Sequence, residues 1–156
     1  MELTRELEKR LFESRRPIDR MVAREKKRVI EAYKNDPEIA RGVAAGIGKA
    51  AALWTKNAEV VKEAVKFVSK MYVDEDVKRA IEAYKDTPEI GREVAEWIGK
   101  VAWWTEDTEA VKLASWTIEA YKDTPEIGRE VAEWIEGITL WTKNAEAVKL
   151  ASRAIE

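Results

Sequence analysis

Apolar residues recur every three or four positions along most of the chain, which is the spacing of one face of an amphipathic helix. At about 100° per residue, for example, one face of residues 90–105 carries Ile90, Val94, Trp97, Ile98, Val101 and Thr105. The pattern predicts helices near residues 18–34, 37–54, 58–72, 75–85, 88–104, 108–122, 125–141 and 145–156, and one over about 3–13. We therefore expect an all-α protein.

Helix start signals alternate regularly along the chain. Prolines follow residues with short polar side chains at Asp36, Thr87 and Thr124, which predicts a helix beginning at each proline. About seventeen residues after each proline-glutamate pair comes a second candidate N-cap, at Asn57, Asp107 and Asn144. Each unit is therefore predicted to be a helix, a tight turn and a second, antiparallel helix.

The units are copies of one another. Residues 81–98 return unchanged as residues 118–135, and 27 of 37 positions are identical between residues 80–116 and 117–153. An older copy starts at Val29. It is followed by an irregular spacing, because Tyr33 and Tyr84 are 51 residues apart whereas Tyr84 and Tyr121 are 37 apart. We expect the extra residues to break the helix near Val73, with Asp74 capping a short additional helix.

A single domain follows from these repeats. We place a basic N-terminal helical region at residues 1–28 and the repeats at about 29–79, 80–116 and 117–156.

The repeated segment resembles a known family. Read together, EAVKLASWTIEAYKDTPEIGREVAEWIGKV, from Glu109–Asp123 and the helix pattern at Thr87–Val101, looks like HEAT repeats of the phycobilisome-lyase type. The resemblance covers about residues 29–156 and implies a right-handed α-solenoid of antiparallel helix pairs. Arg41, Arg92 and Arg129 come one residue later than the family's usual arginine. Tetratricopeptide repeats are the alternative, although their period and glycine spacing match less well.

Composition argues against most enzyme chemistry. The chain has no Cys and no His, so thiolate chemistry, disulfides and imidazole-based catalysis or metal binding are excluded. Repeated glutamates at 89, 93, 96, 126, 130 and 133 lie beside Arg92 or Arg129, which favours surface ion pairs over paired catalytic acids. We predict no enzyme activity, no cofactor and no metal site. The abundance of charged residues and the scarcity of Asn and Gln are typical of thermostable proteins, either natural thermophile proteins or designed sequences.

Two tryptophans stand out as candidate interaction residues. Trp116 lies on the polar face of its predicted helix, where the other repeats have Lys66 and Arg153. Trp103 likewise lies near Arg92 on its helix. Tryptophans also recur at the end of each first helix, at 54, 104 and 141, where we expect core or hinge packing. A small-ligand site lined by Trp97, Trp104 and Trp134 is a third hypothesis.

Charge is distributed unevenly along the chain. Residues 1–34 contain 11 basic and 7 acidic side chains, whereas the remaining 122 contain 17 and 23, although the whole chain has a net charge of −2. A basic stripe of Arg16, Arg20, Arg24 and Lys27 could contact phosphates, so nucleic-acid binding is the alternative function. We favour it less because the repeats are acidic.

The leading hypothesis is a non-enzymatic helical-repeat module that binds another protein or itself. The chain ends without a polar capping repeat, which predicts exposed apolar surface at that end. A homodimer through this C-terminal end or through the Trp103/Trp116 region follows. No secretory signal or membrane span is evident, so we expect a cytoplasmic protein.

Overall fold

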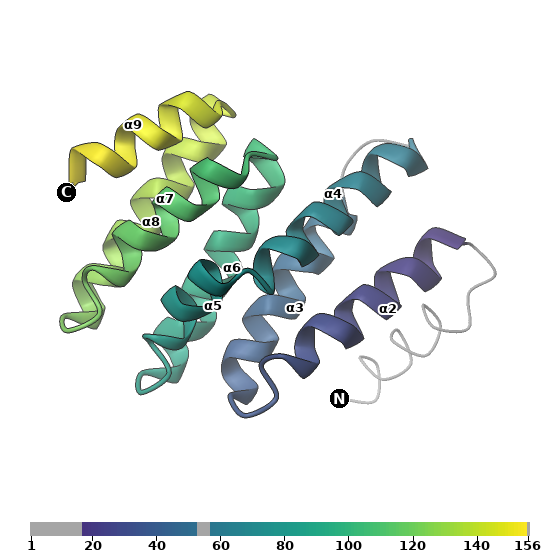
Figure 1. Cartoon of the computed structure of the whole chain (residues 1–156), viewed down its shortest axis with the longest axis horizontal. Coiled ribbons are helices and arrows are strands. Elements are labelled where there is room, and N and C mark those ends of the chain that lie inside the picture. Colours follow the sequence, from purple (N-terminus) through teal and green to yellow (C-terminus); the bar gives the residue numbers. More distant parts are fainter. Residues whose placement is uncertain (1–16, 53–56, 156) are drawn as a thin grey trace.

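The computed structural model describes residues 17–52 and 57–155. Within these residues it consists of eight helices and contains no strand. With the labels of Figure 1, they are α2 (Pro17–Glu31), α3 (Pro37–Ala51), α4 (Ala58–Tyr72), α5 (Glu75–Glu82), α6 (Pro88–Thr105), α7 (Thr108–Glu119), α8 (Pro125–Thr142) and α9 (Ala145–Ile155). The all-α prediction is confirmed. The helix predicted at 3–13 and the end of the one predicted at 37–54 lie outside the described residues.

The helices form two layers (Figure 1). In the first, which we call layer A, α3 packs on α6 and α6 packs on α8. In the second, layer B, α2 lies against α4, and α5, α7 and α9 follow one another. Each layer A helix also packs against the layer B helix that follows it in the chain. Among the described helices, α2 and the α8/α9 pair therefore lie at opposite ends of the stack.

The core fills the space between the layers. Ile90, Val94, Ile98 and Val101 are buried, as the helical periodicity predicts. Trp97 from the same predicted face is only half-buried.

Glycines allow layer A helices to approach closely. A Cβ at Gly42 in α3 would overlap the backbone of Arg92 in α6, and one at Gly46 or Gly99 would overlap the Tyr72 side chain. The buried Tyr72 hydroxyl donates a hydrogen bond to the Ala95 carbonyl at 2.7 Å. These glycines therefore make room for a tyrosine inserted between α3 and α6.

The repeated tyrosines connect successive helices of layer B. The Tyr33 hydroxyl donates to the Tyr72 carbonyl at 2.6 Å, and that of Tyr84 donates to the Ile118 carbonyl. The Tyr121 hydroxyl donates to the Ile155 carbonyl at 3.3 Å. The same side chain thus satisfies a carbonyl near the end of the next layer B helix in each unit.

The predicted N-caps of layer B helices are confirmed. Side chains of Asn57, Asp74, Asp107 and Asn144 accept hydrogen bonds from backbone N–H groups in the first turn. The break at Asp74 is also confirmed, because α4 ends at Tyr72 and α5 begins at Glu75.

The predicted caps before the prolines are wrong in one respect. Asp36, Thr87 and Thr124 occupy the N-cap position, but none makes a side-chain capping hydrogen bond. The hydroxyls of Thr87 and Thr124 donate backwards instead, to the carbonyls of Tyr84 and Tyr121 at 3.3 and 3.4 Å.

Three helices end three residues earlier than predicted, at Glu31, Glu82 and Glu119 rather than at 34, 85 and 122. The residues after each end form tighter three-residue turns, such as the bond from Tyr84 N–H to the Ile81 carbonyl.

Candidate interaction surface

One face of α8 exposes several large apolar side chains. The corresponding face of α6 packs against α8, and Ile90 on it is only 7% exposed. Its counterpart Ile127 in α8 is 46% exposed, and Trp134 and Trp141 are 49% and 89% exposed. Nothing in the described part of the chain packs on this side of α8. We call Ile127, Glu130, Trp134, Gly137 and Trp141 the α8 face.

Trp141 corrects a prediction. The sequence pattern assigned Trp54, Trp104 and Trp141 to packing, and Trp104 is half-buried with its ring stacked on Trp103. Trp141 is almost fully exposed, because no described helix follows α8 in layer A. Trp54 lies outside the described residues.

A shallow groove runs over the α8 face. Its lining residues are Glu130, Glu133, Trp134, Glu136, Gly137, Ile138 and Trp141. A Cβ placed on Gly137 would meet nothing within 4 Å, so no contact inside the chain requires glycine there. Glycine in a helix interior costs about 1 kcal/mol relative to alanine. Its presence between two exposed tryptophans therefore serves no packing need of this chain.

The charge pattern of the α8 face differs from that of the faces buried between repeats. The positions equivalent to Gly137 are Lys49 and Lys100, and each pairs with a glutamate of the next layer A helix. The Lys100–Glu136 pair is 3.2 Å long. At Gly137 the lysine is absent and Glu130 and Glu133 remain exposed. The α8 face is therefore acidic as well as apolar.

Two cations from the third repeat contact the α6 face. Arg129 Nε lies 2.8 Å from Glu93, and the Lys143 ammonium lies 4.5 Å from the centre of the Trp104 ring. Glu130 and Trp141 are the equivalents of Glu93 and Trp104 one repeat later. Within the described residues, neither has a basic partner.

Trp116, one of the predicted interaction residues, is 42% exposed. Its indole contacts Asp76 of α5, and this contact, with Arg79 and Lys112 nearby, holds the pKa of Asp76 below its usual range. Trp116 therefore lies across α7 and α5. Trp103 is half-buried and stacks on Trp104, with ring centres 4.6 Å apart. A role for either residue in binding stays a prediction.

A ligand site lined by Trp97, Trp104 and Trp134 stays a prediction. The groove over α8 is lined by Trp134 and Trp141, and neither Trp97 nor Trp104 contributes to it. The sequence does contain a sign that Trp141 is exposed. Gly137, four residues earlier, stands where the other repeats have a lysine that pairs with the next helix.

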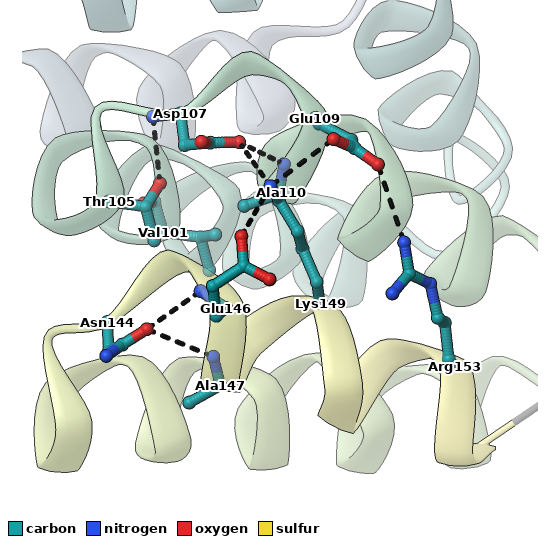
Figure 2. Close-up of polar contacts among 10 residues, drawn as sticks. All are labelled: Val101, Thr105, Asp107, Glu109, Ala110, Asn144, Glu146, Ala147, Lys149 and Arg153. Carbon is teal, nitrogen blue, oxygen red and sulfur yellow. Dashed lines mark hydrogen bonds and ion pairs between the residues drawn. The ribbon is translucent and has the colours of Figure 1, made fainter.

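An ion-pair network fixes α9 on α7 (Figure 2). The Lys149 ammonium lies within 3.0–3.6 Å of carboxylates of Glu146, Glu109 and Asp107, and Arg153 pairs with Glu109 at 3.4 Å. The hydrogen bond to Glu146, together with Glu109 and Asp107, raises the pKa of Lys149. This network is explained by helix packing, because Lys112 contacts the cap residue Asp74 in the same way one helix earlier.

The basic stripe lies at the other end of the stack. Arg20, Arg24 and Lys27 are exposed on α2, while Met21, Val22 and Val29 on the opposite side are buried. Arg16 lies outside the described residues. The two ends of the stack therefore carry opposite charges.

Among the described residues, no cluster of three or more Asp, Glu, His or Cys side chains is arranged to hold a metal ion. None of the helices in the described ranges has the length and apolar character needed to cross a membrane.

Comparison of the chain with family models, with curated proteins and with solved structures gives no match.

Proposed function

We propose that this chain is a non-enzymatic helical-repeat module for protein–protein association. In this proposal the helix pairs are HEAT-like repeats of 37 residues arranged as a right-handed α-solenoid. Support comes from the recurrence of the same contacts in successive units. The Tyr84 and Tyr121 hydroxyls bond equivalent carbonyls, and Lys112 and Lys149 contact equivalent cap residues.

The observation that carries the proposal is the exposure of the α8 face. Trp134 and Trp141 repeat residues that are half-buried one unit earlier, and Ile127 repeats the buried Ile90. Aromatic side chains clustered on an exposed surface are the typical anchors of protein interfaces. The α8 face has the same apolar residues that α6 uses to pack against the next repeat. In the described structure, however, no further repeat packs against α8.

The test is the mass of the protein in solution as a function of concentration. Sedimentation equilibrium from about 10 μM to about 1 mM covers affinities of weak and moderate interfaces. We expect the wild-type mass to rise above the monomer value of 17.9 kDa. Trp141→Arg should weaken association by about 30-fold, which corresponds to the loss of about 2 kcal/mol at an interface anchor.

Trp116→Arg is the matched control, because it also replaces an exposed tryptophan with arginine but lies on α7, away from the α8 face. It should associate like the wild type. A wild-type protein that stays monomeric throughout the range would overturn the proposal. A dimer lost in Trp116→Arg and kept in Trp141→Arg would move the interface to the Trp116 region.

Nucleic-acid binding is the alternative, and the exposure of Arg20, Arg24 and Lys27 on α2 is the observation that favours it. It predicts binding to duplex DNA that weakens steeply as salt rises. We favour association because the basic surface occupies one end of the stack, whereas the α8 face at the other end is acidic.

A further inference from the structure

The partner of the α8 face can be inferred from the charges at the two ends of the stack. We propose that this partner is the α2 helix of a second copy of the chain, so that copies join head to tail. This inference rests on the proposed function, because it takes the α8 face to be an association surface.

The equivalent face of α6 is contacted by basic side chains of the next repeat. Arg129 and Lys143, both from the third repeat, contact Glu93 and Trp104. The same two positions on α8 are Glu130 and Trp141, which have no cation within the described part of the chain. A partner that binds the α8 face as α8 binds α6 must therefore place basic side chains against Glu130 and Trp141.

Helix α2 presents such basic side chains. Arg20, Arg24 and Lys27 are exposed and recur every three or four residues, so they lie along one side of the helix. Glu126, Glu130 and Glu133 recur with a similar spacing on α8 and are also exposed. In each set the first and last residues are seven positions apart, or about 10 Å of helix at 1.5 Å per residue. The two rows of opposite charge therefore match in length.

The groove at Gly137 has room for a basic side chain. The glycine leaves a depression between Trp134 and Trp141, and a Cβ there would have open space around it. An arginine or lysine side chain lying in this depression would meet an aromatic ring as well as a carboxylate. Arginine in particular stacks on aromatic faces, and such cation–π contacts strengthen when water is excluded.

Pairing like ends is disfavoured by the same charges. Two α8 faces brought together would place Glu130 and Glu133 of one copy near those of the other, and two α2 helices would bring Arg24 and Lys27 together. Like charges in an interface oppose association. The head-to-tail contact instead joins the α8 face of one copy to the α2 helix of another. The first copy's α2 helix and the second copy's α8 face remain free to bind further copies.

The decisive experiment uses one variant for each end. An α8-blocked variant carries Trp134→Ala and Trp141→Ala, and an α2-blocked variant carries Arg24→Glu and Lys27→Glu. All four residues are exposed, and far-UV circular dichroism with thermal unfolding checks that each variant is folded. By light scattering, each variant alone should associate at least about 30-fold more weakly than the wild type.

The equimolar mixture gives the specific readout. The intact α8 face of the α2-blocked variant can bind the intact α2 of the α8-blocked variant, and no further copy can join. We therefore expect a discrete 1:1 complex with twice the monomer mass. A mixture that stays monomeric would overturn the head-to-tail arrangement.

An α2-blocked variant that dimerises like the wild type would also overturn it and would show pairing through α8 alone. Salt provides an independent measurement on the wild type. Raising sodium chloride from about 50 mM to about 500 mM should weaken association by at least about tenfold, because the Debye length shortens. Association that is insensitive to salt would contradict the charge pairing. A wild type that never associates would instead reject the proposed function itself.

Discussion

At the scale of single residues, identical side chains have different surroundings in successive repeats. Trp104 and Trp141 occupy the same repeat position, yet one is half-buried beside Lys143 and the other is 89% exposed. The difference comes from the neighbouring unit, since α8 covers α6 and nothing in the described residues covers α8. A residue's role in a repeat protein therefore depends on its unit's place in the stack.

Two helix-interior glycines with different surroundings give a matched pair of variants. Gly42→Ala would push a Cβ into the Arg92 backbone, whereas Gly137→Ala would place one in open space. We expect Gly137→Ala to raise the free energy of unfolding by about 0.5–1 kcal/mol, the intrinsic helix gain. Gly42→Ala should lower it by about 1–3 kcal/mol, because the helices must separate. Urea denaturation measures both, and equal effects would contradict the difference in packing.

Tyr84 predicts a pH dependence of stability. Burial, with Glu119 nearby, raises the pKa of Tyr84 from 10.0 to about 12. The folded state therefore keeps the tyrosine proton over a range in which the unfolded state loses it. This contribution to stability is complete below about pH 10 and is lost as the pH rises toward about 12.

The measurement is urea denaturation of the wild type and of Tyr84→Phe at pH 9 and pH 11. At pH 9 the variant should be less stable by about 1 kcal/mol, the value of a typical hydrogen bond. The wild-type advantage should shrink at pH 11. Comparing the two proteins cancels the titration of lysines common to both. An advantage that grows with pH would contradict the raised pKa.

At the scale of helices, local signals set most boundaries. The Asn144 side chain accepts from the N–H groups of Glu146 and Ala147 at 2.8 and 3.2 Å, as its position before a helix predicts. Thr124 looks equally suitable in sequence but donates its hydroxyl to the Tyr121 carbonyl instead. Both the residue type and the direction of its side chain therefore matter for capping.

These two caps predict different effects of mutation. Asn144→Ala should lower the free energy of unfolding by about 1 kcal/mol, the usual cost of removing a capping side chain. Thr124→Ala should cost less than about 0.5 kcal/mol, because no helix N–H loses a partner. Thermal and urea unfolding of both variants measure the difference. A larger loss in Thr124→Ala would mean that its backward bond matters more than a helix cap.

The extra helix α5 also follows from local reasoning. An uninterrupted helix from α4 would turn the apolar face away from the core, so a break was expected, and Asp74 provides it by accepting from Asp76 and Val77 N–H groups. Local reasoning did not predict that α2, α5 and α7 end three residues early. The turns after these helices also position Tyr33, Tyr84 and Tyr121 toward the next layer B helix. Such contacts join residues more than 30 positions apart.

At the scale of the whole molecule, a stack of units is least protected at its ends. Helix α6 packs against α3, α4, α5, α7 and α8, whereas α9 packs against α7 and α8. We expect amide hydrogen exchange to be slower in α6 than in α9, because end units open with less loss of contact. Mass spectrometry of exchange in peptides from the two helices measures this. Equal protection throughout would indicate a single cooperative unit.

Concentration adds a second, separate expectation. If α8 lies in an interface, raising the protein concentration should slow exchange in residues 125–142 while leaving α6 unchanged. The Trp141→Arg variant is the control, and it should show no such dependence.

The sequence alone determined the helices, their pairing in units, the layer B caps and the exposed basic stripe of α2. These features depend on hydrophobic periodicity and on contacts between residues a few positions apart, and both can be identified in the amino-acid sequence. The tertiary structure decided which equivalent residues are covered. The exposed α8 face, the insertion of Tyr72 beside Gly46 and Gly99, and the Asp76 contact of Trp116 depend on neighbours distant in sequence. Residues 81–98 and 118–135 are identical in sequence, so only their different neighbours in space distinguish the buried Ile90 from the exposed Ile127.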